Sequence, residues 1–349
     1  MIFLCAVSES DAKSIPIISG KLRSTLKNLK DYKVWLDVYA PDDIEIQDLV
    51  SIYGIDKELL TGHKYMSSVY GMKKELSLST TNYSKILCFD NYIFFELSSY
   101  FLDEDSEINY NKSPMMYRAK AKFFIGDDFI ISFHHSSFPI NSRTSTILVM
   151  KKKYESFISD TLTIIMDSIL DDYYDVISNI REAVTVIEDR VVDNYIDGAI
   201  PVIRYNKKKW IILDDLIEDQ MNMFRPVRLA VMSWTNDTLK ETMIGFYDDL
   251  YSLSNTLDRV KENITEVWNM YAVLSQDKMN DTMFKMNIGL GIFVPVSLLL
   301  GFFGLSIGPL PMSTWGVKGV EVLAFIILIY IIFIGGVIYY KIKKEDSEG

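Results

Sequence analysis

The segment from Met286 to Ser306 reads MNIGLGIFVPVSLLLGFFGLS, and the segment from Val322 to Tyr340 reads VLAFIILIYIIFIGGVIYY. Neither contains Asp, Glu, Lys or Arg, and a helix needs about 20 mostly apolar residues to cross a bilayer. The segment between them, 307–321, holds two prolines and three glycines, which predicts a short loop. We therefore expect two membrane spans in a hairpin. Two helices cannot enclose a water-filled path, so transport would require several copies of the chain.

Net charge and the positions of lysine narrow the class of protein. The net charge of −11 argues against nucleic acid as the main partner. The two cysteines, Cys5 and Cys88, indicate neither a disulfide framework nor a thiolate metal site. Lysines flank the two spans on one side, whereas the loop has only Lys318, so both termini are expected in the cytoplasm and the protein in the cell membrane. The flanking lysines are Lys278, Lys285, Lys341, Lys343 and Lys344.

Residues 1–150 have the pattern of a cytoplasmic α/β domain. Helices are expected at 17–29 and at 44–53, the second after the start signal Pro41-Asp42-Asp43. Gly126-Asp127-Asp128 predicts a hairpin turn. Five segments rich in β-branched and aromatic residues predict strands: Ile2–Val7, Lys33–Tyr39, Ile86–Leu97, Ala119–Ile125 and Phe129–His134.

From about Tyr154 apolar residues recur every three to four positions, which predicts amphipathic helices. Residues 151–235 are expected to form a cytoplasmic helical hairpin, broken at Gly198 and Pro201, with its second helix from about Lys208 to Met232. Residues 236–306 are expected to form one stalk helix of 71 residues, about 105 Å long, that continues into the first span. The periodic residues of the stalk are Leu239, Met243, Phe246, Leu250, Leu253, Leu257, Val260, Ile264 and Val267.

The expected α+β architecture ends with three further segments: an outside loop at 307–321, a second span at 322–340 and a basic cytoplasmic tail at 341–349.

The layout resembles the CorA family of divalent-cation channels over nearly the whole chain. Three parts of the chain carry the resemblance. They are Trp35-Leu36-Asp37, the acidic helix at 159–189, and Asn280-Asp281-Thr282-Met283 followed by Phe293-Val294-Pro295 and Gly301-Phe302-Phe303-Gly304. It implies a homopentamer in a lipid bilayer, with five long helices around a pore and funnel-shaped cytoplasmic domains that sense the transported ion.

The chain departs from this family at the signature after the first span. The family has Gly-Met-Asn, or Gly-Val-Asn in its zinc-transporting branch, whereas this chain has Gly304-Leu305-Ser306. In the family these groups hold a hydrated divalent ion at the outer mouth. A Ser hydroxyl can still accept from a coordinated water, but it is shorter than the amide. The loop segment 308–312 also lacks the family's carboxylate, so we expect weaker attraction of cations to the mouth.

One stripe on the inner helix is the candidate pore lining, because its members recur every three to four residues and so share a face. Neutral oxygen donors suit Mg²⁺, which keeps several waters. Rings of Met283 and Val294 could gate by dewetting. Asn287 and Ser297 have an alternative role, hydrogen bonding between helices. The stripe comprises Asn280, Met283, Asn287, Gly291, Val294, Ser297 and Gly301, and the resemblance puts Asn280, Met283, Val294, Ser297, Gly301 and Ser306 at the family's pore positions.

Regulatory residues are less distinct in the sequence. The long-helix carboxylate to which the family's gating is ascribed aligns near Gly245, so Asp248 and Asp249, within one turn, are candidate regulatory metal ligands, and a solvated helix face is the alternative. The acidic residues Asp167, Asp171, Asp172 and Asp175 have the same two interpretations. Lys341, Lys343 and Lys344 fit a basic collar or a headgroup anchor. His134 and His135 end a strand and point to opposite faces, which does not favour one metal site.

Together these observations favour a pentameric channel for a divalent cation, with Mg²⁺ as the expected ion and Co²⁺ or Ni²⁺ as further substrates. No catalytic residue and no cofactor are expected. One alternative is a Zn²⁺ transporter of the ZntB type, with or without proton coupling. Another alternative is a CorA-fold membrane sensor or scaffold that no longer conducts. The changed signature Gly304-Leu305-Ser306 and the loop without carboxylates favour this alternative, whereas the polar stripe on the inner helix argues against it.

Overall fold

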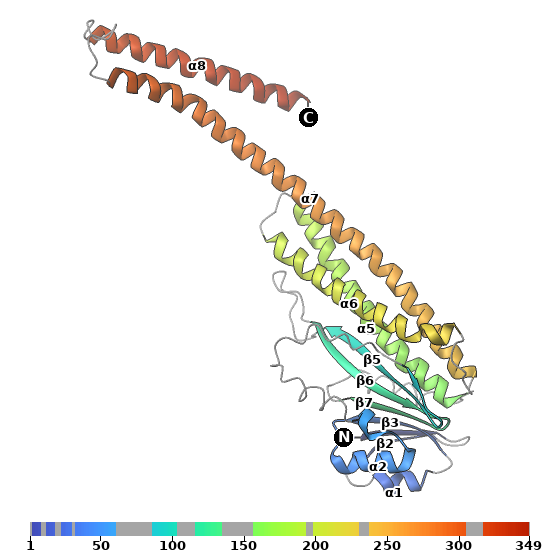
Figure 1. The fold of residues 1–349 in the computed structure, drawn as a ribbon. Helices are drawn as coiled ribbons and strands as arrows, with labels where there is room; N and C mark the ends of the chain where they lie inside the picture. The colour runs from blue at the N-terminus through green and yellow to red at the C-terminus, as the bar shows by residue number, and fades with distance from the viewer. Residues whose placement is uncertain are drawn as a thin grey trace. The chain divides into compact units, whose positions relative to one another are not determined.

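The structure is a computed structural model of the 349-residue chain. It describes residues 2–7, 12–17, 22–29, 32–60, 86–102, 116–134, 156–192, 198–229, 237–304 and 317–348. Figure 1 shows the order of the elements along the chain. The chain divides into two compact units, Met1–Trp268 and Asn269–Gly349, which we call unit 1 and unit 2.

Unit 1 is built on a seven-stranded sheet with the order β2-β1-β3-β7-β6-β5-β4. Its central pair, β3 and β7, is parallel, and Trp35 lies opposite Ile130 in the register. The other neighbouring pairs are antiparallel. The strands are β1 Ile2–Val7, β2 Ala12–Ile17, β3 Lys33–Tyr39, β4 Leu87–Cys88, β5 Ile93–Leu102, β6 Met116–Ile125 and β7 Phe129–His134.

The structure differs from the expected strands at three places, one of which is the start of β6 at Met116 rather than at Ala119. The segment expected as one strand at 86–97 forms β4 and β5, because Asp90 and Asn91 make a tight turn in which Phe89 N donates to Tyr92 O at 2.9 Å. Such residues favour two-residue hairpin loops. Strand β2 was not expected, and it includes Ile17, which was assigned to the first helix. The Gly126 hairpin is confirmed, since Gly126 N donates to Phe129 O at 2.9 Å.

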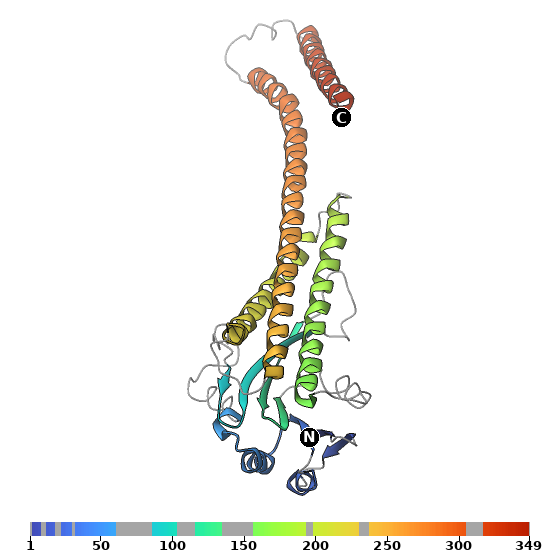
Figure 2. The ribbon, with the colours of Figure 1, turned by 90° about the vertical axis from the view of Figure 1, so that its right-hand side faces the viewer.

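Helices cover both faces of the sheet (Figures 1 and 2). Helices α1 (Leu22–Lys27) and α2 (Asp43–Tyr53) pack on one face, where their leucines and isoleucines join the core of Leu4, Leu36 and Ile131. Helices α5 (Phe157–Val192) and α6 (Ala199–Arg228) pack on the other face. There the Phe95 ring of β5 meets the Phe224 ring of α6 edge-on, with centroids 5.7 Å apart.

Helix α6 begins earlier than the sequence suggests. It starts at Ala199 rather than near Lys208, and Pro201 lies inside its first turn. A proline is tolerated there because the first amides of a helix have no intrahelical acceptor. The start is marked instead by Gly198, whose φ of 85° favours glycine. Pro226 also lies inside α6, near its end.

Helix α7 runs from Asp237 to Gly304, 68 residues that belong to both units, and contains Pro295. All nine periodic residues expected in the stalk are buried in unit 1. Helix α8 runs from Val317 to Glu348. Within the described part of the chain, no helix combines the length and the apolar character that a bilayer crossing requires. The two expected spans, 286–306 and 322–340, therefore stay predictions.

Candidate functional site

The seven residues of the expected pore-lining stripe lie on α7, within unit 2. The segment is helical without a break from 280 to 301, so at 3.6 residues per turn the stripe covers about 120° of its circumference. In the single chain the side chains of Asn280, Met283, Asn287 and Val294 are exposed, and Ser297 is half-buried. The face carries polar and apolar side chains in alternation along the helix.

Several contacts within unit 2 involve this part of α7. Gln276 Nε2 donates to Asn280 Oδ1 at 3.2 Å, so the Asn280 amide already has one local partner. Lys285 Nζ lies 2.6 Å from Asp281 Oδ2, one turn away on the exposed surface. The Tyr330 hydroxyl of α8 donates to the Gly291 carbonyl at 3.0 Å, which links the two helices of unit 2 at a position of the stripe.

Unit 2 exposes many large apolar side chains in the single chain. On α7 they include Met286, Leu290 and Phe293, and Phe293 is 69% exposed. On α8 they are Phe325, Ile326, Leu328, Ile329, Ile332, Phe333 and Val337. Apolar surface of this extent marks a face that meets another protein or a membrane.

Part of the expected site lies outside the described residues. Gly304 is the last residue of α7, whereas Leu305, Ser306 and the loop segment 307–316 are not described. The side chains of Lys341, Lys343 and Lys344 are also outside the described part, although their backbone belongs to α8.

The candidate regulatory carboxylates, Asp248 and Asp249, lie on α7 in unit 1 and are exposed. Asp248 forms an ion pair with Arg228 at the end of α6, and the Arg228 guanidinium lies 5.0 Å from the centre of the Tyr247 ring. Burial raises the pKa of Asp167 on α5, and the charges of Asp249 and Asp171 raise it further. Among the described residues, no group of three or more His, Cys, Asp or Glu is arranged to hold a metal ion.

Two of the acidic residues on α5 thus differ in their surroundings. Asp167 lies near the carboxylates of Asp171 and of Asp249 on α7, and a bound cation or proton would reduce the repulsion among these carboxylates. Asp172 instead points at the sheet, since its Oδ2 accepts from Ser99 Oγ at 2.7 Å. The solvated-face interpretation therefore does not describe Asp172, which helps to hold α5 against β5.

A buried polar cluster at the centre of the sheet was not expected from the sequence. Asp37 of β3 and His134 of β7 are both 2% exposed, and His134 Nε2 lies 3.1 and 3.2 Å from the two Asp37 oxygens. Ser132 Oγ donates to Asp37 at 2.5 Å and accepts from Trp35 Nε1 at 3.1 Å. This pairing satisfies a buried carboxylate, as low-dielectric surroundings require. It depends on the parallel pairing of β3 with β7, which no local pattern reveals.

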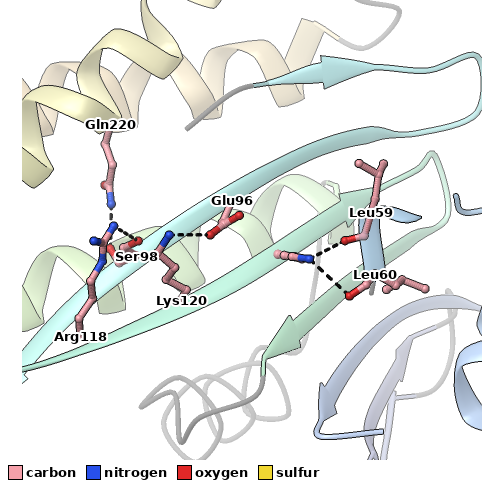
Figure 3. A network of polar contacts seen from close by, with 8 residues as sticks. Leu59, Leu60, Glu96, Ser98, Arg118, Lys120 and Gln220 are labelled. Carbon is pink, nitrogen blue, oxygen red and sulfur yellow. Dashed lines mark hydrogen bonds and ion pairs between the residues drawn. The ribbon is translucent and has the colours of Figure 1, made fainter. Parts of the chain in front are cut away.

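A second polar cluster joins the sheet to the helical layer (Figure 3). Gln220 Nε2 of α6 donates to Ser98 O and to the Tyr173 hydroxyl, both at 2.8 Å, and Tyr173 itself donates to Ser98 O. Arg118 donates to Ser98 Oγ at 3.1 Å, and Lys120 forms an ion pair with Glu96. Because Tyr173 of α5 and Gln220 of α6 both bond to Ser98 of β5, the cluster fixes α5 and α6 on β5.

Two buried lysines have structural partners. Lys122 Nζ donates to the carbonyls of Leu59 and Leu60 at 2.6 and 3.4 Å (Figure 3). Lys209 Nζ donates to Asn179 Oδ1 at 2.9 Å and lies 5.0 Å from the centre of the Tyr205 ring. Burial lowers the pKa of both ammonium groups, that of Lys209 to about 8.

Comparison with known proteins gives one family. A family model described as "CorA-like Mg2+ transporter protein" matches residues 30–344. Among curated proteins, the "Putative metal ion transporter YfjQ" of Bacillus subtilis (strain 168) is 21% identical over 207 residues. These residues are 56% of this chain and 62% of that protein, so the match spans less than two thirds of the relative's length.

Two solved structures match nearly the whole chain. The complete structure of the CorA magnesium transporter from Methanocaldococcus jannaschii covers 97% of this chain with 96% of its own length, at a TM-score of 0.64 and 17% identity. The full-length CmaX protein covers the same shares at a TM-score of 0.64 and 14% identity. At these identities the likeness concerns the fold, an α/β domain followed by long helices.

Proposed function

Because this chain belongs to the CorA-like Mg²⁺ transporter family, we propose that it moves a divalent metal cation across a membrane and that the cation is Mg²⁺. The cation is cargo, so the chain needs no catalytic residue. The observation that carries the proposal is the stripe from Asn280 to Gly301, which follows one face of an uninterrupted helix. Co²⁺ and Ni²⁺ are further candidate ions, because neutral oxygen donors that contact a hydration shell discriminate weakly among small divalent cations.

We propose that unit 2 lies in the cell membrane, with spans at 286–306 and 322–340 and both termini in the cytoplasm. Two features support this: the two segments contain no charged residue, and unit 2 exposes large apolar side chains on both helices. The lysine distribution supports the orientation, with the segment 307–321 outside. Residues 317–321 of this expected loop form the start of α8 instead. The Gly291–Tyr330 hydrogen bond suits an apolar environment, since it satisfies a hydroxyl within the unit.

Several copies are required for a pore, and the family resemblance makes the proposed assembly a homopentamer. In it the stripes of five α7 helices would face one another. Rings of Asn280 and Ser297 would contact the water shell of the ion, and rings of Met283 and Val294 would close the path by dewetting. The outer ring of Gly304-Leu305-Ser306 would offer a hydroxyl where the family has an amide.

Cation uptake into liposomes tests this function. The purified full chain is reconstituted, and the initial uptake of Mg²⁺, Co²⁺, Ni²⁺ and Zn²⁺ is measured against protein-free vesicles. We expect Mg²⁺ uptake that Asn280→Leu reduces to the level of empty vesicles. Thr282→Leu is the matched control, because Thr282 is exposed and lies about 160° around the helix from Asn280. Equal loss in both variants, or uptake of Zn²⁺ alone, would contradict the proposal.

A second candidate function is a membrane sensor or scaffold that does not conduct. Gly304-Leu305-Ser306 and the loop segment 308–312, which has no carboxylate, favour it. An intact oligomer that gives no flux for any of the four ions would support this function.

We also propose that Asp248 and Asp249 contribute to regulation by cations. Both are exposed on the same turn of α7, and Asp249 shares an acidic neighbourhood with Asp167 and Asp171 of α5. A cation bound there would lower the repulsion among these carboxylates and strengthen the packing of α5 on α7.

A further inference from the structure

A pocket of about 330 Å³ lies between α6 and α7 within unit 1, away from the stripe and from the acidic residues of α5. Its volume is at the lower end of the range in which proteins bind small molecules, about 300–1,000 Å³. The two helices run antiparallel here, since Arg228 pairs with Asp248 whereas Trp210 Nε1 donates to the Leu257 carbonyl at 3.0 Å. Each helix therefore lines the pocket with residues of about two turns.

The floor of the pocket is apolar and aromatic. Ile203, Trp210 and Ile264 line it and are almost fully buried, with exposures of 4, 9 and 5%. Trp268, which is 45% exposed, forms a second indole wall. Two indoles beside a buried apolar floor suit a flat aromatic ring, which every nucleobase offers.

The rim of the pocket is cationic. Arg204, Lys207 and Lys261 line it and are exposed, and the Lys261 ammonium lies 5.1 Å from the centre of the Trp210 ring. No carboxylate is among its lining residues, although the chain carries a net charge of −11. Three cations at one rim indicate a ligand with several negative charges.

The surrounding charges place the two ends of such a ligand. Asp214 and Asp258 repel one another near Lys261, which partly compensates the Asp214 charge, so this end of the pocket is less favourable for an anion. Lys207 lies about two turns, and Arg204 about three turns, from Asp214 along α6. Within the described part of the chain neither has an ion-pair or hydrogen-bond partner, so both are open to an anionic group.

We propose that this pocket binds a nucleoside di- or triphosphate, with the base against Trp268 and the buried floor and the phosphates at Arg204 and Lys207. The inference goes beyond metal transport, and it concerns residues of unit 1 only.

Binding of ATP and ADP to the purified full chain in detergent, measured by calorimetry with and without Mg²⁺, tests this proposal. We expect Lys207→Glu to weaken ATP binding about tenfold or more, because it removes a charge-assisted contact. Lys208→Glu is the matched control, since Lys208 is the next residue, is exposed and does not line the pocket. It should change the affinity by less than about twofold, as expected for an exposed charge outside the site.

Two further arms separate the ring from the phosphates. Inorganic triphosphate should bind about fivefold or more weakly than ATP, because it lacks a base to stack. Trp268→Leu should weaken ATP but leave inorganic triphosphate unchanged. The proposal is overturned if ATP gives no binding at millimolar concentration, if Lys207→Glu and Lys208→Glu act alike, or if short-chain phosphatidylglycerol binds in place of ATP. Binding is measured without transport, so a chain that does not conduct can still pass this test.

Discussion

The Lys209 side chain is buried in the helical layer of unit 1, with 2% of its surface exposed. Its pKa is about 8 in the folded chain, against 10.5 for an ordinary lysine, because burial disfavours the charged form. Between about pH 8 and 10.5 the unfolded chain therefore binds more protons than the folded chain, and stability increases with pH across this window. Below pH 8 the cost of burying the charge is fully present.

The variant Lys209→Met should accordingly be stabilised most below pH 8. We expect its melting temperature to exceed that of the parent chain at pH 7, with a difference that shrinks as the pH approaches 10. The measurement is thermal unfolding by intrinsic fluorescence in detergent at several pH values. Lys208→Met, at an exposed neighbour, is the control and should show no such trend. A difference that is constant with pH would show that Lys209 acts through packing alone.

Arg228 forms an ion pair with Asp248, one of the two candidate regulatory carboxylates. Arg228→Ala should free Asp248 and so lower the Mg²⁺ concentration that gives half-maximal protection of the purified protein against limited proteolysis. Arg225→Ala removes a nearby exposed arginine on the same last turn of α6 and should leave that concentration unchanged. If Arg228→Ala raises the required concentration, Asp248 is not a ligand and its pairing with Arg228 is structural.

At the scale of single elements, α2 shows how a short sequence signal sets a helix boundary. Asp42 Oδ1 accepts from Glu45 N at 2.8 Å, and Glu45 Oε2 accepts from Asp42 N at 3.1 Å, which is a complete capping box. Asp42→Ala should reduce the local stability of α2 by about 1 kcal/mol. Hydrogen exchange of the α2 amides should then be about fivefold faster. Asp43→Ala, at an exposed neighbour without this contact, should change exchange much less.

The elements that could be predicted are those whose own residues determine them. The period of buried residues along α5 and α7 was visible because each helix turns one apolar stripe to the core. Strand β2 escaped prediction because its segment, Ala-Lys-Ser-Ile-Pro-Ile, has little apolar alternation and depends on pairing with β1. The start of α6 was missed because Pro201 reads as a break yet fits a first turn.

The site residues divide in the same way. The stripe on α7 could be proposed from spacing, because positions on one helix face follow from the sequence alone. Three other features could not be predicted from the sequence, because each brings together residues from separate elements. They are the Asp37–His134 pair, the Gln220 cluster and the pocket between α6 and α7. Two signals were visible but uninterpreted: a carboxylate inside an apolar strand, and Arg204, Lys207 and Trp210 at helical spacing.

At the scale of the whole molecule, we propose that the outer ring at Gly304-Leu305-Ser306 sets the ion preference. Ser306→Asn restores the amide that the family uses, and its longer reach should change how the ring contacts the water shell of the ion. We expect a changed ratio of Mg²⁺ to Co²⁺ uptake in liposomes at equal protein content. Ser313→Asn makes the same change elsewhere in the loop and should leave the ratio unaltered. An unaltered ratio in Ser306→Asn would exclude residue 306 from the ion path.

The parallel pairing of β3 with β7 also bears on how ribosomes make this chain. Trp35 of β3 bonds to Ser132 of β7, 97 residues later. At about 5–20 residues per second, roughly 5–20 s pass between the synthesis of the two strands. Throughout that interval β3 has β1 on one side and an open edge on the other, and an open edge can pair with a neighbouring nascent chain. We therefore expect the yield of correctly closed sheet to depend on translation speed between codons 40 and 134, with slow codons there favouring aggregation on crowded polysomes.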